Sequence, residues 1–430
     1  MFFNKIYTEK SISTIIFHNL AVSNSKQYKM DNKILQVSDS VKWIGVLDKN
    51  LKTFDIIMET KFGTTYNSYF IDADKIAVVE TVKEKFFDVY ETKLRQVCNP
   101  EEIEYIILDH TEPDHSGSLK KMLEIAPNAT VLASGPALKF LRNQLGFDFP
   151  QKELKEGDII DLGNKKIRVI SAPNLHWPDS IYTYLEEDKV LFTCDSFGAH
   201  FCSEEMFDDK AGNYDEAFKY YFDVILKPFS KFFLKAIDKI RPLEINAILT
   251  GHGPLLTTTW KQKVDWSEEM CKEYLAHNPE KNRILLAFVS AYGFTRTIAE
   301  KLKEGLEEIE DITVDYCDIE EMPADILADK ISRASAYLLG SPTINQNMLP
   351  QLYNIFAMMT PIRDRDKLAG CFGSFGWSGE AERDLVNNFE NLKLNFCGDT
   401  LFLKFKPQEE DFERIKTYGK KFGLLVKGQK

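Results

Sequence analysis

Four potential metal ligands lie within six residues of this chain, directly after an apolar run that predicts a buried strand. The run is Tyr-Ile-Ile-Leu at residues 105–108, and residues 109–115 then read Asp-His-Thr-Glu-Pro-Asp-His. Short apolar runs bounded by polar residues are typical of strands inside a sheet. Alternate side chains of an extended loop share a face, so we expect one face to carry His110, Glu112 and Asp114. His115 is then expected at the bend that precedes a helix.

Three further potential ligands occupy the same kind of position, each at the end of an apolar run. They are His176, Asp195 and His252. Taken alone, the first segment is also compatible with a polar turn that contains two histidines. The repetition of one arrangement along the chain favours a metal site instead. The remaining three histidines do not belong to such a ligand motif and are interpreted as structural or surface residues: His18, His200 and His277.

The order of these residues resembles the metallo-β-lactamase superfamily, whose first motif is usually His-x-His-x-Asp-His. In this chain Glu112 replaces the second histidine. A carboxylate makes the site harder and more anionic, which suits two iron ions better than two zinc ions. The motif His-x-Glu-x-Asp-His, followed by the later His, Asp and His, resembles the flavodiiron proteins. All seven ligand positions of that family are filled in order.

The resemblance implies a role for each ligand. One iron would be held by His110, Glu112 and His176, and the other by Asp114, His115 and His252. Asp195 would bridge the two ions, where a carboxylate lowers the repulsion between neighbouring cations. We expect Asp195 and His176 to be the residues most directly involved in catalysis. Family members differ in whether the histidine at position 176 reaches its iron, so its ligation stays open.

A second domain is predicted from Arg283 onward, where strand and helix patterns alternate to the end of the chain. This alternation predicts a parallel, doubly wound sheet. The loop at residues 290–295 places hydroxyl groups around a glycine at the start of a helix, and it lacks the Gly-x-Gly-x-x-Gly fingerprint of dinucleotide-binding folds. Backbone N–H groups at a helix N-terminus suit a phosphate. On its own the loop is equally compatible with an ordinary helix cap.

Two later loops strengthen the ligand-site interpretation, because they follow predicted strands of the same sheet. They are residues 340–347 and 373–380, and together with residues 290–295 they resemble the FMN site of a flavodoxin. The resemblance implies a flavin ring between the two later loops, with Trp377 near it; the alternative for Trp377 is core packing. The expected cofactor-binding residues are Ser290, Tyr292, Gly293, Phe294, Thr295, Pro342, Thr343, Asn345, Ser374, Phe375, Gly376, Trp377 and Gly379.

The predicted domain organisation follows from these resemblances. Many short strands interleaved with helices fit a sandwich of two sheets covered by helices, which in the metallo-β-lactamase superfamily is an αββα fold. Residues 213–240 predict one long aromatic-rich helix or a kinked pair that breaks at Pro228. The proposed divisions are an N-terminal extension at 1–30, the lactamase-like domain at 31–275, a linker at 276–282 and the flavodoxin-like domain at 283–430.

The composition of the chain limits the cellular compartment and the binding partners that we expect for it. A net charge of −12 argues against nucleic acid as a partner. Seven scattered cysteines without a Cys-x-x-Cys pair exclude an Fe–S motif and a fused rubredoxin module, and predict a reducing cytoplasm. No apolar run reaches the roughly 18 residues that a membrane span requires. The basic N-terminal residues 1–29 are compatible with an organelle-targeting segment or with a simple extension.

The flavodiiron resemblance implies an oxidoreductase in which FMN receives electrons from a separate donor and a di-iron centre reduces O2 to water or NO to N2O. We favour O2, the common activity among stand-alone two-domain members, and keep NO as the alternative. The expected donor is a rubredoxin-like protein, its reductase or a reduced cofactor, and the expected assembly is a head-to-tail homodimer or a dimer of dimers. A zinc hydrolase fused to a flavodoxin domain, and a non-catalytic electron carrier, are the rival hypotheses.

Overall fold

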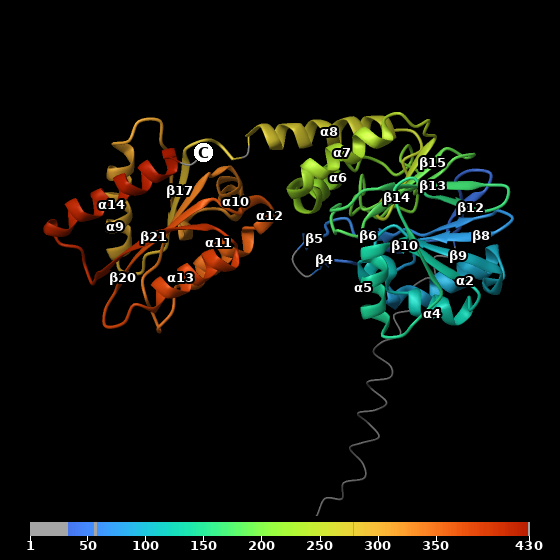
Figure 1. Cartoon of the computed structure of the whole chain (residues 1–430), viewed down its shortest axis with the longest axis horizontal. Coiled ribbons are helices and arrows are strands. Elements are labelled where there is room, and N and C mark those ends of the chain that lie inside the picture. The colour runs from blue at the N-terminus through green and yellow to red at the C-terminus, as the bar shows by residue number, and fades with distance from the viewer. Residues whose placement is uncertain (1–32, 56–57, 278, 429–430) are drawn as a thin grey trace, which may run out of the picture. The chain divides into compact units, whose positions relative to one another are not determined.

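The computed structural model describes residues 33–55, 58–277 and 279–428. The predicted extension at 1–30 lies outside the described residues. The chain divides into two compact units, which are considered separately below (Figure 1). The first unit runs to Val224 and includes Lys235–Val264, and the second comprises Ile225–Leu234 and Asp265–Lys430. The domain boundaries proposed from the sequence stay predictions.

Two sheets form the centre of the first unit. In the seven-stranded sheet the strands β1, β2, β7 and β8 are antiparallel, and β8, β9, β10 and β11 are parallel. Its strands, in spatial order, are β1 (Leu35–Gln36), β2 (Val41–Trp43), β7 (Tyr69–Ile71), β8 (Ile76–Val79), β9 (Ile103–Leu108), β10 (Thr130–Ser134) and β11 (Gln151–Leu154). The predicted strand before the ligand segment is therefore β9, in the interior of this sheet.

The second sheet has five strands, and only its last pair is parallel. They are β12 (Ile159–Asp161), β13 (Lys166–Ser171), β14 (Ile181–Leu185), β15 (Val190–Cys194) and β16 (Ala247–Thr250). Two small sheets flank them: β3 (Val46–Asp48) with β6 (Thr64–Tyr66), and β4 (Thr53–Phe54) with β5 (Met58–Glu59). Alternation along β8, β9 and β13 sends one set of apolar side chains between the two large sheets, where Val79, Ile107 and Val169 share one buried cluster.

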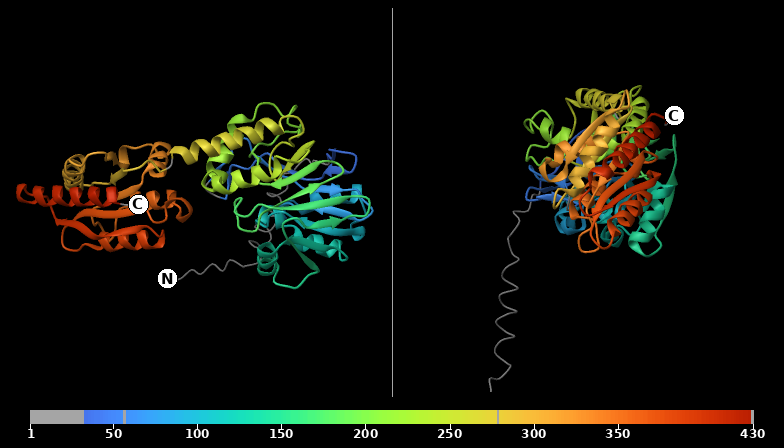
Figure 2. Two further views of the ribbon diagram at one scale, coloured as in Figure 1. Left: turned by 45° about the horizontal axis from the view of Figure 1, so that its top comes forward. Right: turned by 90° about the vertical axis from the view of Figure 1, so that its left-hand side faces the viewer.

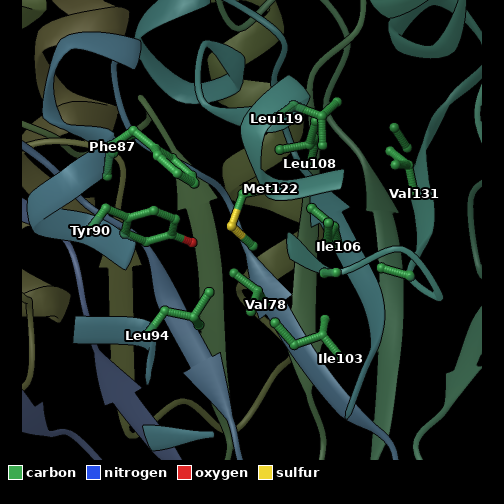
Figure 3. Packing of buried hydrophobic residues seen from close by; sticks show 14 of the residues in the cluster. Val78, Phe87, Tyr90, Leu94, Ile103, Ile106, Leu108, Leu119, Met122 and Val131 are labelled. Carbon is green, nitrogen blue, oxygen red and sulfur yellow. The ribbon is translucent and has the colours of Figure 1, made fainter. Parts of the chain in front are cut away.

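The opposite face of the seven-stranded sheet is covered by helices. Val78, Ile106 and Val131 of the strands belong to the same buried cluster as Tyr90 and Met122 of the helices, and Figure 3 shows this cluster. The helices that supply this layer are α2 (Phe87–Val97), α4 (Leu119–Ile125) and α5 (Gly135–Leu145). Because consecutive strand residues serve opposite faces, one strand contributes to both clusters.

The aromatic-rich segment at 213–240 is a kinked pair of helices. This is one of the two alternatives that the sequence predicted. The helices are α6 (Asp215–Tyr221) and α7 (Ser230–Ile240), which lie beside the second sheet (Figure 1). Between them run a π-helical turn at Phe222–Leu226 and a 3₁₀ turn at Lys227–Phe229. Pro228 has no N–H to continue an α-helical ladder, so the break falls where proline predicts it.

The second unit is a doubly wound parallel sheet with helices on both faces (Figure 2). Its strands, in spatial order, are β18 (Thr313–Asp318), β17 (Arg283–Phe288), β19 (Ala336–Gly340), β20 (Leu368–Phe375) and β21 (Asn395–Lys404). The helices α9 (Phe294–Glu307) and α14 (Glu409–Gly428) cover one face, and α10 (Ala324–Arg333), α11 (Pro350–Met358) and α13 (Glu380–Asn391) cover the other. The chain also forms the helices α8 (Trp260–His277) and α12 (Pro361–Asp364). The strand order reverses between β17 and β19, the point at which such sheets bind ligands.

Candidate functional site

The ligand segment after β9 is shorter in its extended part than the sequence predicted. A helical turn, α3 (Pro113–Ser116), begins within it, with Pro113 at its first position. Proline favours that position because its fixed φ suits the first helical turn and no N–H is lost there. The prediction that His110, Glu112 and Asp114 share one face of an extended loop is therefore wrong. The turn rotates Asp114 away from the other two and toward a different set of partners.

The structure brings all seven predicted ligands together, in two neighbouring groups. Within each group the potential ligand atoms lie within 4.8 Å of one another. The first group contains His110, Glu112, His176 and Asp195, and the second contains Asp114, His115 and His252. Apart from Asp195, which the family resemblance places between the two iron ions, these are the sets that the resemblance implied.

Asp195 connects the two groups with its two carboxylate oxygens. Its Oδ2 lies 3.4 Å from Nε2 of His176 and faces the first group. Its Oδ1 lies 3.2 Å from Nε2 of His115 and 3.5 Å from Nε2 of His252, in the second group. A carboxylate with one oxygen toward each group has the geometry that a bridge between two cations needs.

Burial of the ligands is uneven. The side chains of His110, His115 and His252 are at most 1% exposed, and Asp195 is 2% exposed. The side chain of His176 is 21% exposed, and Glu112 beside it is 11% exposed. The side of the site formed by His176 and Glu112 is therefore its least buried side.

The histidines are oriented by groups on their far sides, as metal-binding histidines usually are. Nδ1 of His110 lies 3.2 Å from a carboxylate oxygen of Asp179, and Nδ1 of His252 lies 2.6 Å from the carbonyl oxygen of Thr65. A histidine that donates its Nδ1–H to such an acceptor keeps the Nε2 lone pair for a cation. In both cases Nε2 is the atom that faces the other ligands.

The second ligand group contains buried carboxylate oxygens that a bound cation would satisfy. Both carboxylate oxygens of Asp114 are buried, and no described residue donates a hydrogen bond to them, although Nε2 of His252 lies 3.0 Å from one. Buried polar atoms are nearly always satisfied, and those that are not point to a missing partner. Three carboxylates and four histidines offer hard oxygen and imidazole donors, which suit iron.

Electrostatics in the site point the same way. Burial lowers the pKa of His115, but Asp114 and Asp195 more than offset it and raise that pKa to about 10. His176 behaves alike: burial opposes protonation, while Asp195 and Glu112 raise its pKa to about 9. The carboxylates thus draw positive charge into the site, which protons supply in the metal-free protein and metal ions supply when bound.

Several residues that contact the ligands were missed by sequence reasoning. Asp179 was missed although it stands three residues after His176, and the Thr65 carbonyl has no side-chain signature at all. Tyr221 on α6 donates a hydrogen bond from Oη to Oδ1 of Asp195, at 2.8 Å. His200 is buried rather than at the surface, with its ring centroid 5.1 Å from that of His252.

The second unit contains a cavity of about 560 Å³ at the carboxyl ends of β17, β19 and β20. Nine of the predicted cofactor-binding residues line it: Tyr292, Phe294, Pro342, Thr343, Asn345, Ser374, Phe375, Gly376 and Trp377. Ile344, Gln346 and Ser378, which lie within the two predicted loops, also line it, and so does Phe405, which lies outside them. A cavity of this size with aromatic walls suits a flat aromatic cofactor. Trp377 is 88% exposed, so the alternative of core packing is wrong for this residue.

Four of the predicted residues do not line the cavity. Gly293 has a φ of +81° immediately before α9, a conformation that glycine adopts without strain. Ser290 accepts a hydrogen bond at Oγ from the backbone N–H of Arg296, which closes the loop that precedes this helix. Thr295 is buried and hydrogen-bonds through Oγ1 to Oγ of Ser374, at 3.0 Å. Gly379 precedes α13. The first three therefore shape the N-terminus of α9, where a phosphate is expected.

Fold and site together define a two-domain class: a metallo-β-lactamase-like unit with a two-group metal centre, followed by a flavodoxin-like unit with a cofactor cavity. The family of ODP family beta lactamases matches residues 64–253, and the flavodoxin family matches residues 286–418. Flavo-diiron protein FprA2 of Clostridium acetobutylicum is 37% identical over 91% of this chain and 99% of its own length. This chain belongs to the flavodiiron protein family.

Other relatives agree. The type A flavoprotein fprA of Rhodobacter capsulatus is 36% identical over 91% of this chain and 92% of its own length. The solved structure of rubredoxin oxygen:oxidoreductase from Desulfovibrio gigas aligns with a TM-score of 0.67 at 26% identity, covering 92% of this chain and 99% of its own. The predicted family, fold class and cofactors, FMN and a di-iron centre, are confirmed. Within the described ranges, no helix combines the length and apolar character that crossing a membrane requires.

Proposed function

We propose that this protein reduces O2 to water at its di-iron centre, with NO reduction to N2O as the alternative main activity. Flavodiiron proteins are oxidoreductases that act on these two gases. When bound, the iron pair and FMN supply the electrons for the reduction. The observation that carries the proposal is the position of Asp195, whose two oxygens face two complete groups of predicted ligands.

The residues of this chain contribute by holding that centre in a fixed geometry. We propose that His110, Glu112 and His176 hold one iron, that Asp114, His115 and His252 hold the other, and that Asp195 bridges them. The hydrogen bond from Tyr221 Oη to Oδ1 of Asp195 fixes the orientation of the bridging carboxylate. Preorganised ligands need no rearrangement when the substrate arrives, which is how an enzyme site lowers a barrier.

The flavin site supports the same reaction class. We propose that FMN binds in the 560 Å³ cavity, with its ring against the aromatic side chains and its phosphate at the N-terminus of α9. Backbone N–H groups and the helix dipole favour a negative group there. A flavin domain has a use in gas reduction and none in hydrolysis, so it supports the reductase over the zinc hydrolase.

We further propose that electrons come from a separate donor, such as a rubredoxin-like protein, its reductase or a reduced cofactor. The Desulfovibrio gigas relative is named a rubredoxin oxygen:oxidoreductase, and the sequence of this chain has no Cys-x-x-Cys pair for a rubredoxin module of its own. The proposed assembly is a head-to-tail homodimer or a dimer of dimers. The proposed location is cytoplasmic, as the scattered cysteines of the sequence, without a Cys-x-x-Cys pair, predict.

One experiment tests the function. Iron, zinc and FMN are quantified in the purified full-length protein, which is then reduced anaerobically and mixed with O2 or NO. We expect about two iron ions per chain together with FMN and faster loss of O2 than of NO. Faster loss of NO would reverse the substrate preference. Zinc in place of iron, with no loss of either gas, would contradict the proposal.

A further inference from the structure

Glu80 is a buried carboxylate that none of the assigned roles uses. It lies directly after β8, is 2% exposed and has a backbone φ of +60°. A side chain other than glycine is strained in this left-handed region. Burial of a carboxylate costs further free energy unless hydrogen-bond donors satisfy it. Two unfavourable features at one residue point to a specific role for this side chain.

Glu80 and its neighbour Thr81 hold both ends of the ligand segment at residues 109–115. Oε1 of Glu80 accepts a hydrogen bond from the backbone N–H of Asp109, at 2.7 Å. The carbonyl oxygen of His115 accepts a hydrogen bond from the backbone N–H of Thr81, at 3.0 Å, and another from its Oγ1. These contacts place the backbone of His115 beside Glu80 and leave Oε2 of Glu80 for another partner.

That oxygen and one ring nitrogen of His115 both lack a hydrogen-bond partner. Oε2 of Glu80 and Nδ1 of His115 are buried, and no described residue forms a hydrogen bond with either atom. A ring nitrogen of His115, a carboxylate oxygen of Glu80 and Sγ of Cys194 lie within 4.8 Å of one another. Nε2 of His115 already faces the second ligand group, 3.2 Å from Oδ1 of Asp195 and 3.5 Å from Oδ2 of Asp114. Nδ1 is therefore the nitrogen that remains for Glu80, and a small side-chain rotation closes a gap of this size.

Packing alone does not decide which nitrogen of His115 carries a proton. A Cβ on Gly251 would lie 2.6 Å from Cε1 of His115, so the ring lies directly against the backbone there. Such contact fixes the plane of the ring and is the same for both tautomers. A hydrogen-bond acceptor at Nδ1 does distinguish them, because a histidine that donates its Nδ1–H keeps the Nε2 lone pair for a metal ion.

We infer that Glu80 is a positioning residue for His115: its Oε2 accepts the Nδ1–H of the ring and so directs Nε2 toward the iron of the second ligand group. The inference rests on the proposed role of His115 as an iron ligand and adds a residue that acts through it. Asp179 has the corresponding place beside Nδ1 of His110 in the first ligand group. Each ligand group then has one buried carboxylate on the far side of a histidine.

The variant Glu80→Gln tests the inference, because glutamine keeps the length of the side chain and an oxygen for the N–H of Asp109. Its amide N–H2 group then faces Nδ1 as a donor, which favours the tautomer with the proton on Nε2, the wrong atom for iron binding. Full-length protein loaded with a Mössbauer-active isotope of iron is titrated with a chelator, and the Mössbauer spectrum distinguishes the two irons. We expect the affinity for one iron to fall about 10-fold to 100-fold and the affinity for the other to stay unchanged.

Two further variants separate the charge of Glu80 from a general effect on the fold. Glu84→Gln makes the same replacement at a side chain that is 66% exposed, and it should leave both iron affinities unchanged. Glu80→Asp keeps the charge with one methylene fewer, and it should hold the weakened iron more tightly than Glu80→Gln does. Circular dichroism of the metal-free variants checks the fold. If Glu80→Gln does not fold, selective weakening of one iron in Glu80→Asp is the expected result.

The outcomes separate this inference from the proposed function. Equal weakening of both irons, or no weakening of either, would overturn the positioning role. Natural protein that binds no iron pair and consumes neither gas would refute the proposed function. Natural protein that binds the iron pair and consumes gas, together with unchanged iron affinities in Glu80→Gln, would refute only the role of Glu80.

Discussion

The metal centre takes its predicted ligands from four separate segments of one unit, whereas the flavin cavity is formed by neighbouring loops at one edge of a single sheet. The ligands are almost all buried and act through side-chain atoms. In the flavin cavity Tyr292 and Trp377 are 80% and 88% exposed, and part of the expected binding comes from backbone N–H groups. A site of the first kind depends on residue identity at each position. A site of the second kind depends on where the backbone runs, and tolerates more substitution.

The strongest test of that difference is Asp195→Ala. Without the carboxylate that we propose as the bridge, the two cations would repel each other, and four histidine nitrogens would lose their common partner. We expect iron binding to be lost in large part and gas consumption to fall by about a hundredfold or more, since a ligand matters more than its outer partners do. FMN content should stay at the level of the natural protein. Iron and flavin analysis with anaerobic gas-consumption assays measures all three.

The matched control is Asp72→Ala. The side chain of Asp72 is 62% exposed, and its Oδ2 lies 3.8 Å from Nζ of Lys42. An exposed ion pair of this kind contributes little to stability. The control variant should change neither iron content nor activity. An Asp195→Ala protein that keeps both its iron and its gas consumption would contradict the bridging role and weaken the contrast between the two sites.

A second test is Asp179→Asn, which changes a residue that contacts a predicted ligand but is not itself one. The carboxylate of Asp179 contacts His110 at Nδ1 and also accepts hydrogen bonds from the backbone N–H and Oγ1 of Thr111. Asparagine keeps the shape but removes the charge, so we expect iron affinity to fall about 10-fold to 100-fold. Competition with a chelator measures it. An unchanged affinity would mean that His110 is held by packing alone.

Site residues that act through a particular side chain could be predicted from the sequence more easily than those that act through the backbone. His110, Asp195 and His252 could be predicted because a particular residue type ends a particular strand, and the family order fixes which ligand each one is. The carbonyl of Thr65 could not, because every residue has one and only the fold selects which carbonyl meets His252. Asp179 contacts a histidine 69 positions earlier in the chain, a separation that no local pattern describes.

The one local error has an equally physical origin. Alternation along an extended chain predicts a shared face, but Pro113 starts a helical turn in the middle of the segment. The preference of proline for the first turn of a helix was available in the sequence. In the flavin cavity, the lining residue Phe405 was missed because it lies outside the predicted loops, and only the fold brings it to the cavity. The backbone φ values of Asn345 and Gln346 are +53° and +59°, and no residue pattern in that loop predicted them.

The metal-free protein offers a third test, through its pH dependence. The pKa values of His115 and His176 in the folded chain are about 10 and about 9, above the ordinary value near 6.5. Groups whose pKa is raised by folding stabilise the protein below the unfolded value, and that stabilisation is lost as the pH rises through the folded value.

We therefore expect the free energy of unfolding of the iron-free protein to fall by at least about 1 kcal/mol between pH 6.5 and pH 10. Urea unfolding at several pH values measures it. In the iron-loaded protein the same nitrogens hold metal instead of protons, so this dependence should largely vanish. Identical pH profiles with and without iron would show that these histidines do not form the metal groups.

The smallest expected effect belongs to the flavin cavity, with Trp377→Ala. The indole lines the cavity and is 88% exposed in the absence of a ligand, so it is free to pack against a flat ring. An aromatic pair contributes about 0.5–1.5 kcal/mol beyond area burial. FMN affinity should therefore fall only about threefold to 10-fold, as flavin fluorescence titration measures, and iron content should not change. Ile362→Ala is the control, because Ile362 is also exposed but does not line the cavity. A hundredfold loss would show that one side chain dominates this site as Asp195 dominates the other, and the contrast between side-chain and backbone binding would fail.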